Sequence, residues 1–230
     1  YARGIDLIGF FKNKNGIKCE VPIRIFYFPE NTKSQKQSLL KKYKNISVLG
    51  KIGNEDGKFA LPYGSTFYEN KLFVTDCVNN KVHVFNKNGR MLYSFGQRGY
   101  NTGFMNGVSD IQVYNDLLYI TEQKNHRVSI YTLYGKFLES FGSYAKVPNA
   151  PTTKLGQFFV PIGIDLDKDN LIISDHLNDR IQSINTVTGK PNWVSYNAKE
   201  DNFDFKEPYY LKVDKKRDLI FISNRTRNNI

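Results

Sequence analysis

Residues 118–131, LYITEQKNHRVSIY, decide the fold, because the same pattern occurs twice more in the chain. Residues 72–85 read LFVTDCVNNKVHVF, and residues 171–184 read LIISDHLNDRIQSI. A fourth copy, residues 219–230, reads LIFISNRTRNNI. In the first three copies, short runs with alternating apolar residues lie on both sides of a four-residue turn that contains asparagine. Alternation with a period of two is typical of β-strands, so each copy predicts two antiparallel strands joined by a tight turn.

The copies are spaced like the blades of a β-propeller. An acidic or amide residue ends the first strand of each copy, and successive positions are 46, 53 and 49 residues apart: Asp76, Glu122, Asp175 and Asn224. A period of about 40–50 residues with short strands indicates propeller blades of four strands each. A helical solenoid would instead show apolar residues at helical spacing. The sequence therefore predicts an all-β propeller built from four-stranded antiparallel blades.

Signals for the other two strands of each blade flank the copies. Upstream, proline or glycine marks the start of a strand at residues 62–64 (PYG), 106–108 (NGV), 161–163 (PIG) and 208–210 (PYY). Downstream, a turn with glycine, which tolerates the positive φ of a tight hairpin, leads into a closing strand. Two closing strands end in Phe-Gly, at residues 95–96 and 141–142, whereas the third reads WVSY at residues 193–196.

In these motifs, residues 46–230 resemble the NHL repeat family. The family pattern runs from Pro-x-Gly through a strand ending near Asp, an Asn-containing loop and Arg-Ile/Val to a closing Phe-Gly. Departures from it are Glu122 and Asn224 in place of Asp, and Lys81 and Asn229 in place of Arg. The resemblance implies that ligands bind the face formed by the loops between second and third strands and by the connections between blades.

The recurring polar residues have a structural explanation. A short acidic or amide side chain at a strand end accepts backbone N–H bonds and holds the loop that follows. We therefore interpret Asp76, Glu122, Asp175 and Asn224 as structural repeat residues and not as a catalytic cluster. Arg127 and Arg180 open the next strand, and we expect them to pair with the acidic residue of their own copy.

The first 45 residues do not follow the repeat. Residues 5–11 and 18–28 predict two strands that form part of a blade, and residues 30–45 predict a polar insertion rich in Lys and Ser. Residues 46–230 are the repeat region, with the last blade truncated. A six-bladed ring with this period needs roughly 260–280 residues. Because an unpaired strand edge invites aggregation, we expect an incomplete ring that further chain or a second chain closes.

Composition limits the class of protein. The formal net charge of +11 raises the expectation of an anionic partner, although a diffusely basic surface explains it equally well. No segment approaches the ~20 consecutive apolar residues of a membrane span, so we expect none. The two cysteines, Cys19 and Cys77, form neither a disulfide scaffold nor a zinc motif. Nothing in the sequence fixes the cellular compartment.

The candidate binding residues lie in the loops and connections that the resemblance assigns to the ligand-binding face. Basic side chains there can hold anionic groups, and rings can stack on a partner. The candidates are Arg98, Tyr100, Lys124, His126, His176, Arg225 and Arg227.

The favoured function is a non-catalytic interaction scaffold that presents loops to a protein partner within a larger protein or assembly. The resemblance implies two alternatives. Some NHL propellers of the TRIM type bind single-stranded RNA, and other relatives include a zinc-dependent lyase that uses several histidines. In this chain His83 lies in a predicted strand, and a third ligand beside His126 and His176 is not evident. The chain has no GxSxG, Walker A or HExxH motif. We therefore expect no catalytic residue, metal or cofactor, with a metal-dependent lyase or hydrolase as the second alternative.

Overall fold

The computed structural model describes residues 51–147, 150, 152–196 and 206–224 in full, and residues 3–12 and 18–27 by their backbone. Its strands form four antiparallel sheets of four strands, here called blades I to IV. Blade I contains β3 (Pro62–Tyr68), β4 (Lys71–Asp76), β5 (Lys81–Asn86) and β6 (Met91–Phe95). Blade II contains β7 (Val108–Tyr114), β8 (Leu117–Glu122), β9 (Arg127–Thr132) and β10 (Phe137–Phe141). Blade III contains β11 (Pro161–Asp167), β12 (Asn170–Asp175), the 3-10 turn η1 (His176–Asn178), β13 (Arg180–Asn185) and β14 (Pro191–Tyr196). Blade IV contains β15 (Pro208–Asp214), β16 (Leu219–Asn224), β1 (Arg3–Lys12) and β2 (Lys18–Tyr27).

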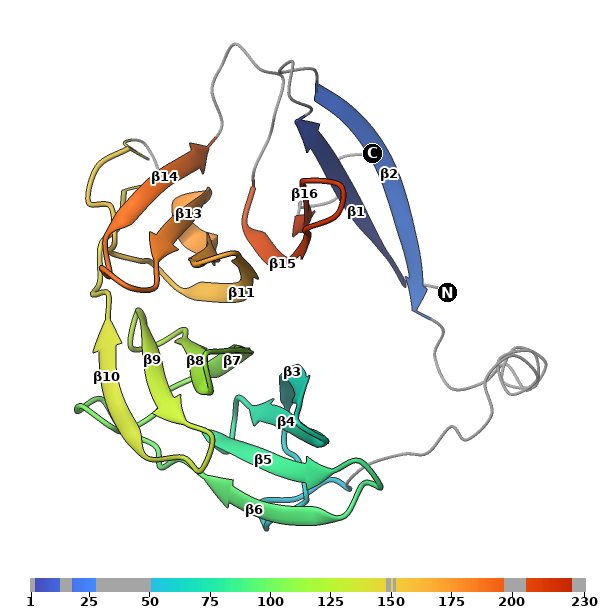
Figure 1. Ribbon diagram of the computed structural model, residues 1–230, viewed down its shortest axis with the longest axis vertical. Coiled ribbons are helices and arrows are strands. Elements are labelled where there is room, and N and C mark those ends of the chain that lie inside the picture. The colour runs from blue at the N-terminus through green and yellow to red at the C-terminus, as the bar shows by residue number, and fades with distance from the viewer. Residues whose placement is uncertain are drawn as a thin grey trace, which may run out of the picture.

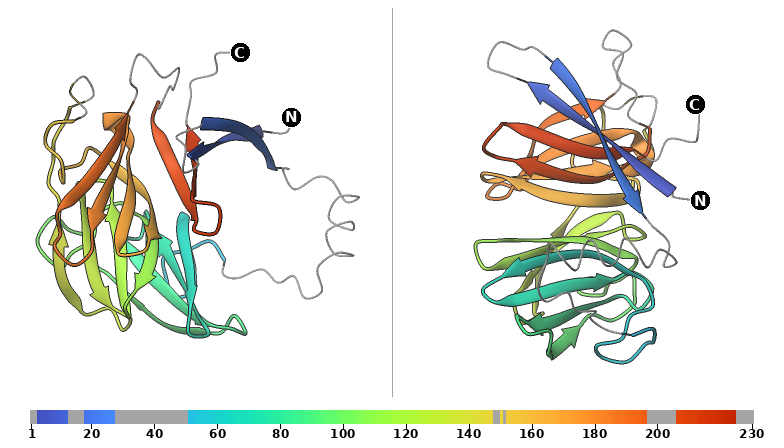
Figure 2. Two further views of the ribbon diagram at one scale, coloured as in Figure 1. Left: turned by 45° about the horizontal axis from the view of Figure 1, so that its top comes forward. Right: turned by 90° about the vertical axis from the view of Figure 1, so that its right-hand side faces the viewer.

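The blades stand around a common centre, with β3, β7, β11 and β15 innermost (Figure 1). Neighbouring blades stack face to face along the arc (Figure 2). Within the described residues, the arc is open between blade IV and blade I. The predicted all-β fold with an incomplete ring is therefore confirmed. No helix in the described part of the chain has the length and apolar character of a membrane span.

Blade IV combines strands from both ends of the sequence. β1 pairs with β16 in antiparallel register from Leu7↔Ser223 to Phe11↔Leu219, and β2 pairs with β1. The two predicted amino-terminal strands therefore lie where the repeat places the third and fourth strands of a blade. The polar insertion predicted at residues 30–45 and the third strand that the fourth sequence copy would begin at Asn229 lie outside the described residues.

The inner strand of blade II begins two residues later than its sequence motif suggests. Val108 pairs with Glu122 in the way that Pro62 pairs with Asp76, so Val108 holds the position of the proline. The predicted marker at residues 106–108 is thus out of register. Asp110 consequently takes the place that glycine holds at Gly64 and Gly163, which the sequence pattern did not indicate.

A hydroxyl near the end of the second strand links each blade to the next. Thr121 Oγ1 accepts the N–H of Asp110 in its own blade, at 2.9 Å, and donates to the carbonyl of Ile162 in blade III, at 2.6 Å. Thr75 makes the same link from blade I to Ser109, and Ser174 makes it from blade III to Tyr209. These bonds satisfy inner-strand groups that the bulged pairing at the start of each inner strand leaves free.

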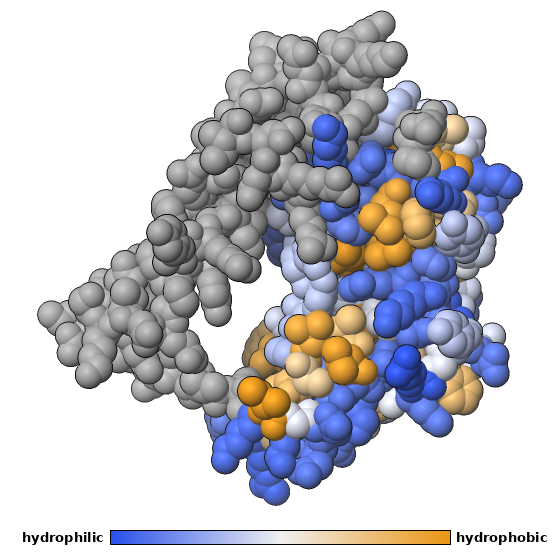
Figure 3. Space-filling model, turned by 180° about the vertical axis from the view of Figure 1, so that it is seen from behind, coloured by the Kyte–Doolittle hydropathy of each residue, from blue (hydrophilic) through white to orange (hydrophobic). Residues whose placement is uncertain are grey.

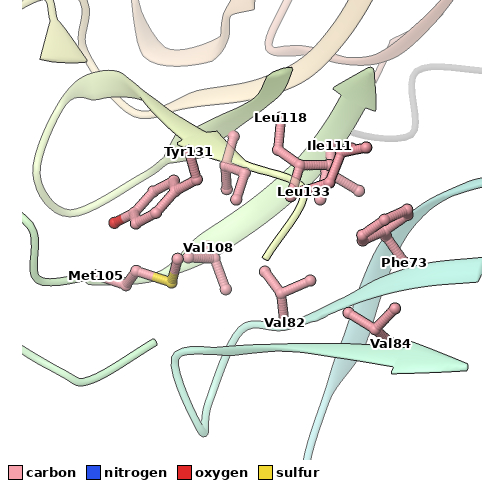
Figure 4. Close-up of a cluster of buried hydrophobic side chains, with 10 residues drawn as sticks. Phe73, Val82, Val84, Met105, Val108, Ile111, Leu118, Tyr131 and Leu133 are labelled. Carbon is pink, nitrogen blue, oxygen red and sulfur yellow. The ribbon is translucent and has the colours of Figure 1, made fainter. Parts of the chain in front are cut away.

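The hydrophobic core lies between the blades. At the junction of blades I and II, Phe73, Val82 and Val84 face Ile111 and Leu118, and all five are fully buried (Figure 4). Similar clusters fill the junctions between blades II and III and between III and IV. Blades II and III therefore each bury one face against the preceding blade and the other against the following blade, and the stack depends on a continuous series of blades.

Neighbouring inner strands approach closely where the repeat has glycine. A Cβ atom on Gly163 would lie 2.6 Å from Tyr209 O and 2.9 Å from Tyr210 Cα in blade IV. Both obstacles are backbone atoms, which cannot rotate away as a side chain would. Gly163 is therefore required for contact between the backbones of β11 and β15.

We predict that Gly163→Ala lowers the free energy of unfolding by about 1–3 kcal/mol, because the added methyl group overpacks this junction. Denaturant unfolding measures the change. Ser183→Ala is the matched control in the same blade, since the buried Ser183 Oγ has no hydrogen-bond partner among the described residues and its loss costs little. A Gly163→Ala protein as stable as the parent would show that β11 and β15 are not in close contact.

Candidate functional site: the loop face

The turns between second and third strands and the connections between blades lie at one end of the arc. Pro62 pairs with Asp76, Asp76 with Lys81, and Val82 with Phe95, so these chain positions share one edge of blade I. Blades II and III have the same register. We call this end the loop face; it holds residues 77–80, 123–126 and 176–179, and the described parts of the connections 51–61, 97–107 and 143–160.

The recurring acidic residues are buried in the blade wall beneath this face. Asp76 accepts the N–H groups of Ala60, at 2.8 Å, and Leu61, at 3.0 Å. Asn79 Nδ2 donates to Asp76 at 2.8 Å and to Gly53 O at 3.0 Å, and so ties the turn to the preceding connection. The pairs Glu122–Asn125 and Asp175–Asn178 repeat the arrangement. Sequence reasoning noted an Asn-containing turn without identifying this role, although asparagine recurs three residues after each acid.

Arg127 and Arg180 extend the same framework. Arg127 Nε lies 3.1 Å from Glu122 Oε1, and its NH2 group donates to Phe104 O at 2.6 Å. Arg180 is fully buried; its Nε lies 2.7 Å from Asp175 Oδ2, and its other nitrogens donate to three carbonyls of the connection before blade III. Both guanidinium groups are therefore engaged with the framework that holds the connections.

His126 supports the junction between blades II and III. It ends its turn in a left-handed conformation, as Asn80 and Asp179 do in theirs, with φ of 53°, 54° and 50° respectively. Its Nδ1 accepts the N–H of Val160 at 3.1 Å, whereas Asn80 accepts from Gly107 and Asp179 from Glu207. Asn, Asp and His tolerate this conformation better than most residues. Burial lowers the pKa of His126, which favours the neutral ring with its proton on Nε2.

His176 faces the next junction. It opens its turn, is buried, and its Nδ1 lies 3.2 Å from Pro208 O. Its ring meets that of Tyr209 edge-on, with ring centroids 5.4 Å apart. His126 is thus the last residue of its turn and contacts the junction of blades II and III, whereas His176 is the first residue of its turn and contacts the junction of blades III and IV. No group of three or more His, Cys, Asp or Glu side chains in the described ranges is positioned to hold a metal ion.

A tyrosine cluster lies at the centre of the arc. The hydroxyl groups of Tyr63 and Tyr209 are in contact, and Tyr210 donates its hydroxyl to Tyr63 O at 3.1 Å. The three ring centroids lie 5.2–6.1 Å apart. These side chains join β3 to β15 across the centre. The sequence pattern did not indicate this cluster, although both inner-strand motifs carry tyrosine, as PYG and PYY.

Asp110 is a buried carboxyl at the junction of blades II and III. It accepts the N–H groups of Ile111, at 2.9 Å, and Ile164, at 3.1 Å. Burial nevertheless raises its pKa to about 7, because removal from water penalises the charged form more than these hydrogen bonds favour it. Asp110 therefore carries partial charge near neutral pH, inside the ring wall and away from solvent.

Candidate residues and their neighbours form two groups on the loop face. Arg98, Tyr100 and Lys124 belong to the junction of blades I and II, where Lys124 lies against Gly107 and Tyr100 is 74% exposed. At the junction of blades II and III, His126, Tyr144 and Phe159 form an aromatic cluster with centroids 5.0–5.9 Å apart. Tyr144 is 55% exposed, and Lys146 Nζ lies 5.9 Å from the centre of the Phe159 ring. Arg225 and Arg227 lie outside the described residues.

Two solved structures share this architecture. The first is selenomethionine-substituted virginiamycin B lyase from Staphylococcus aureus, with a TM-score of 0.50 and 17% identity over 71% of this chain and 49% of that one. The second is hydrazine synthase from Kuenenia stuttgartiensis, with a TM-score of 0.55 and 13% identity over 79% of this chain and 47% of that one. The chain is a β-propeller. It spans about half the length of these two propeller proteins. No protein-family model and no curated protein matches its sequence.

His83 lies inside the propeller wall of blade I and affects its response to pH. Its side chain is fully buried in β5, and Nδ1 accepts the N–H of Gly57 at 3.3 Å. Gln182 holds the equivalent position in blade III, where its Oε1 accepts the N–H of Gly156. Burial lowers the pKa of His83, so the folded protein keeps this ring neutral below the ordinary histidine pKa of 6.5. As pH falls through that value, the unfolded chain gains a proton that the folded chain does not, and stability is lost.

We predict that His83→Gln removes this loss. Between pH 7.5 and 5.5, the variant should gain up to about 1 kcal/mol of stability relative to the parent, because glutamine keeps an acceptor for Gly57 and does not titrate. Denaturant unfolding at several pH values measures the difference, and comparison with the parent cancels the other titrating groups. The reverse exchange in blade III, Gln182→His, should make stability more sensitive to acid. Parallel pH profiles for all three proteins would contradict this role of His83.

Proposed function

We propose that the chain is part of an NHL-type propeller and acts as a non-catalytic scaffold that binds a protein partner at its loop face. The observation that carries the proposal is the contrast between the fixed framework and the variable residues above it. Ile52, Arg98 and Tyr144 hold equivalent positions in the connections that lead into blades I, II and III. Each forms an isolated parallel β-bridge, with Phe59, Met105 and Phe158 respectively, yet the three side chains are unrelated. A rigid framework with different exposed side chains on each blade suits recognition by shape.

Exposed apolar and aromatic residues support a protein as the partner. On the loop face, Ile52 is 95% exposed, and Leu61, Val78, Tyr100 and Tyr144 are also exposed. Tyrosine is enriched at the surfaces where proteins bind one another. The basic side chains of Arg98, Lys124 and Lys146 lie on the same face, so a partner segment with apolar anchors and acidic flanks would fit best.

Binding of single-stranded RNA is the second candidate function. The observation that favours it is the pairing of exposed rings with basic residues nearby in the chain, as Tyr144 with Lys146 and Tyr100 with Arg98. Such pairs stack on bases and hold phosphates. A metal-dependent lyase or hydrolase finds less support, because His126 and His176 serve different junctions and Nδ1 of each lies at hydrogen-bonding distance from a backbone atom.

We predict that Tyr144→Ala and Lys146→Glu each weaken partner binding roughly tenfold, since truncating an interface tyrosine often costs more than 1 kcal/mol. The measurement is recovery of proteins from the source cells by the tagged chain, after nuclease treatment, followed by affinity measurement with the purified partner. Tyr134→Ala is the control, because Tyr134 is 77% exposed in the hairpin turn between β9 and β10, away from the loop face. Thermal unfolding of each variant checks that the fold is retained.

RNA binding is tested by measuring the affinity of the chain for a single-stranded RNA oligonucleotide at several salt concentrations. RNA binding predicts an affinity that falls steeply with salt and is lost when Arg98, Lys124, Arg225 and Arg227 are replaced by Glu. That outcome, without any nuclease-resistant protein partner, would replace the scaffold proposal by the RNA proposal. Equal recovery of a protein partner by the Tyr144→Ala and Tyr134→Ala variants would contradict the loop face as its binding surface.

A further inference from the structure

A group of hydrogen-bond donors lies on the loop face at the junction of blades I and II. We call it the donor site; it consists of Asn106 and Gly107 in the connection before blade II and of Gln123 and Lys124 in the turn after β8. The backbone N–H of Gln123 donates to Gly107 O at 2.9 Å, and that of Lys124 donates to Asn106 O at 3.2 Å. The two segments are therefore paired, and their side chains start from neighbouring positions.

The backbone N–H groups of the donor site are already used. Those of the turn donate to the connection, as described above. The N–H of Asn106 donates to the carboxylate of Glu122 at 3.1 Å, and the N–H of Gly107 donates to Asn80 Oδ1 at 2.6 Å. The donors that remain for a ligand are therefore those of the side chains.

Two side-chain amides of the donor site have no hydrogen-bond partner. Asn106 is 1% exposed, and neither its Nδ2 nor the buried Nε2 of Gln123 has a partner among the described residues. Such groups are a more specific signal than polarity, because hydrophilic residues cover much of the face that Figure 3 shows, whereas unpartnered buried donors are rare. A third unpartnered atom in this turn, Asn125 Oδ1, takes the place of Asn178 Oδ1, which accepts the N–H of Val147, and so belongs to the framework.

The other blades keep the same turn without these donors. The residues at the equivalent positions, identified by the backbone bonds that they share with the donor site, are Ala60, Cys77 and Val78 in blade I and Phe159, His176 and Leu177 in blade III. None of them carries a side-chain amide or an ammonium group. The framework of the propeller therefore does not require the amides of Asn106 and Gln123 or the charge of Lys124.

Lys124 supplies a positive charge beside the two amides. Its side chain is exposed and forms no ion pair with a described residue. A Cβ atom on Gly107 would lie 3.2 Å from Lys124 Cγ and 3.4 Å from Gln123 Cβ, so the glycine leaves open the space between these two side chains. Burial raises the pKa of the Cys77 thiol, and the nearby Lys124 ammonium offsets part of that rise. The charge thus extends from blade II toward the turn of blade I.

We propose that the donor site binds a carboxylate group. Two amide groups and one ammonium group match the two acceptor oxygens and the single negative charge of a carboxylate. A phosphate group with close to two negative charges would keep part of its charge uncompensated by these residues. The carboxylate belongs to an acidic residue of a partner or to a free organic acid. This inference goes beyond the scaffold proposal, because a free organic acid would bind here without any protein partner.

Titration with acetate, followed by NMR of the chain labelled with nitrogen-15, tests the proposal. The side-chain amide signals of Asn106 and Gln123 are assigned by their loss in Asn106→Ala and Gln123→Ala. When sodium acetate replaces sodium chloride at constant ionic strength, both signals should shift together and reach saturation with one dissociation constant. Lys124→Val, which places the residue of blade I at this position, should weaken acetate binding roughly tenfold.

Lys136→Val is the matched control, because Lys136 is exposed in the same blade but lies in the hairpin turn between β9 and β10. It should leave the acetate affinity unchanged. Shifts that do not saturate, or that appear at lower concentrations of sodium phosphate than of acetate, would overturn the proposal. Acetate binding that Lys124→Val and Lys136→Val affect equally would overturn it as well.

A second probe identifies the source of the carboxylate. It is a short peptide, blocked at both ends, that contains one Glu, and the same peptide with Gln is its control. Tighter binding of the Glu peptide than of acetate supports an acidic residue of a partner, whereas equal or weaker binding supports a free organic acid. Binding of the Gln peptide as tight as that of the Glu peptide would contradict recognition of a carboxylate. Failure of the scaffold proposal in the Tyr144→Ala experiment would leave the acetate titration unchanged, so the two proposals fail separately.

Discussion

Each of blades I to III depends on a buried carboxylate at the end of its second strand. Asp76, Glu122 and Asp175 each receive the N–H of the chain that enters the inner strand and the side-chain amide of the asparagine three residues later. A buried carboxylate is costly unless hydrogen bonds or an opposite charge compensate it. The carboxylate therefore fixes three segments at once: its own turn, the entering strand and the connection that the asparagine holds.

The surroundings of the carboxylate change together from blade to blade. Glu122 is longer than the two aspartates, and the residue beside it on the third strand is the short Ser129, whose hydroxyl contacts Oε1. Asp175 is shorter, and the longer Gln182 reaches it at 3.0 Å. In blade I, Lys81 binds Asp56 at 3.1 Å and not Asp76, so Asp76 relies on four N–H donors from Ala60, Leu61 and Asn79. The repeat thus preserves a satisfied carboxylate while its individual partners vary.

The sequence predicted the strands that recur and missed contacts that only the three-dimensional arrangement brings together. The strands of residues 72–85, 118–131 and 171–184 could be predicted because every copy carries the same alternation and turn. The pairing of β1 with β16 could not, because a contact between residues 7 and 223 has no local signal. The register of blade II was wrong because Asn106-Gly107 resembles a strand marker, whereas pairing with Glu122 places Val108 first. The aromatic cluster of the loop face was missed as a unit, since His126, Tyr144 and Phe159 meet only when two blades stack.

Two buried groups with opposite behaviour shape the response of the propeller to pH. His83 has a lowered pKa, so its contribution to stability is present above pH 6.5 and is lost as pH falls below that value. Asp110 has a pKa raised to about 7 from 3.8, so its contribution is present below 3.8 and is lost as pH rises through 7. Between pH 3.8 and 6.5 the two trends therefore oppose each other. Both groups are buried inside the propeller wall, so a pH change in this range acts through them on the stability of the folded blades.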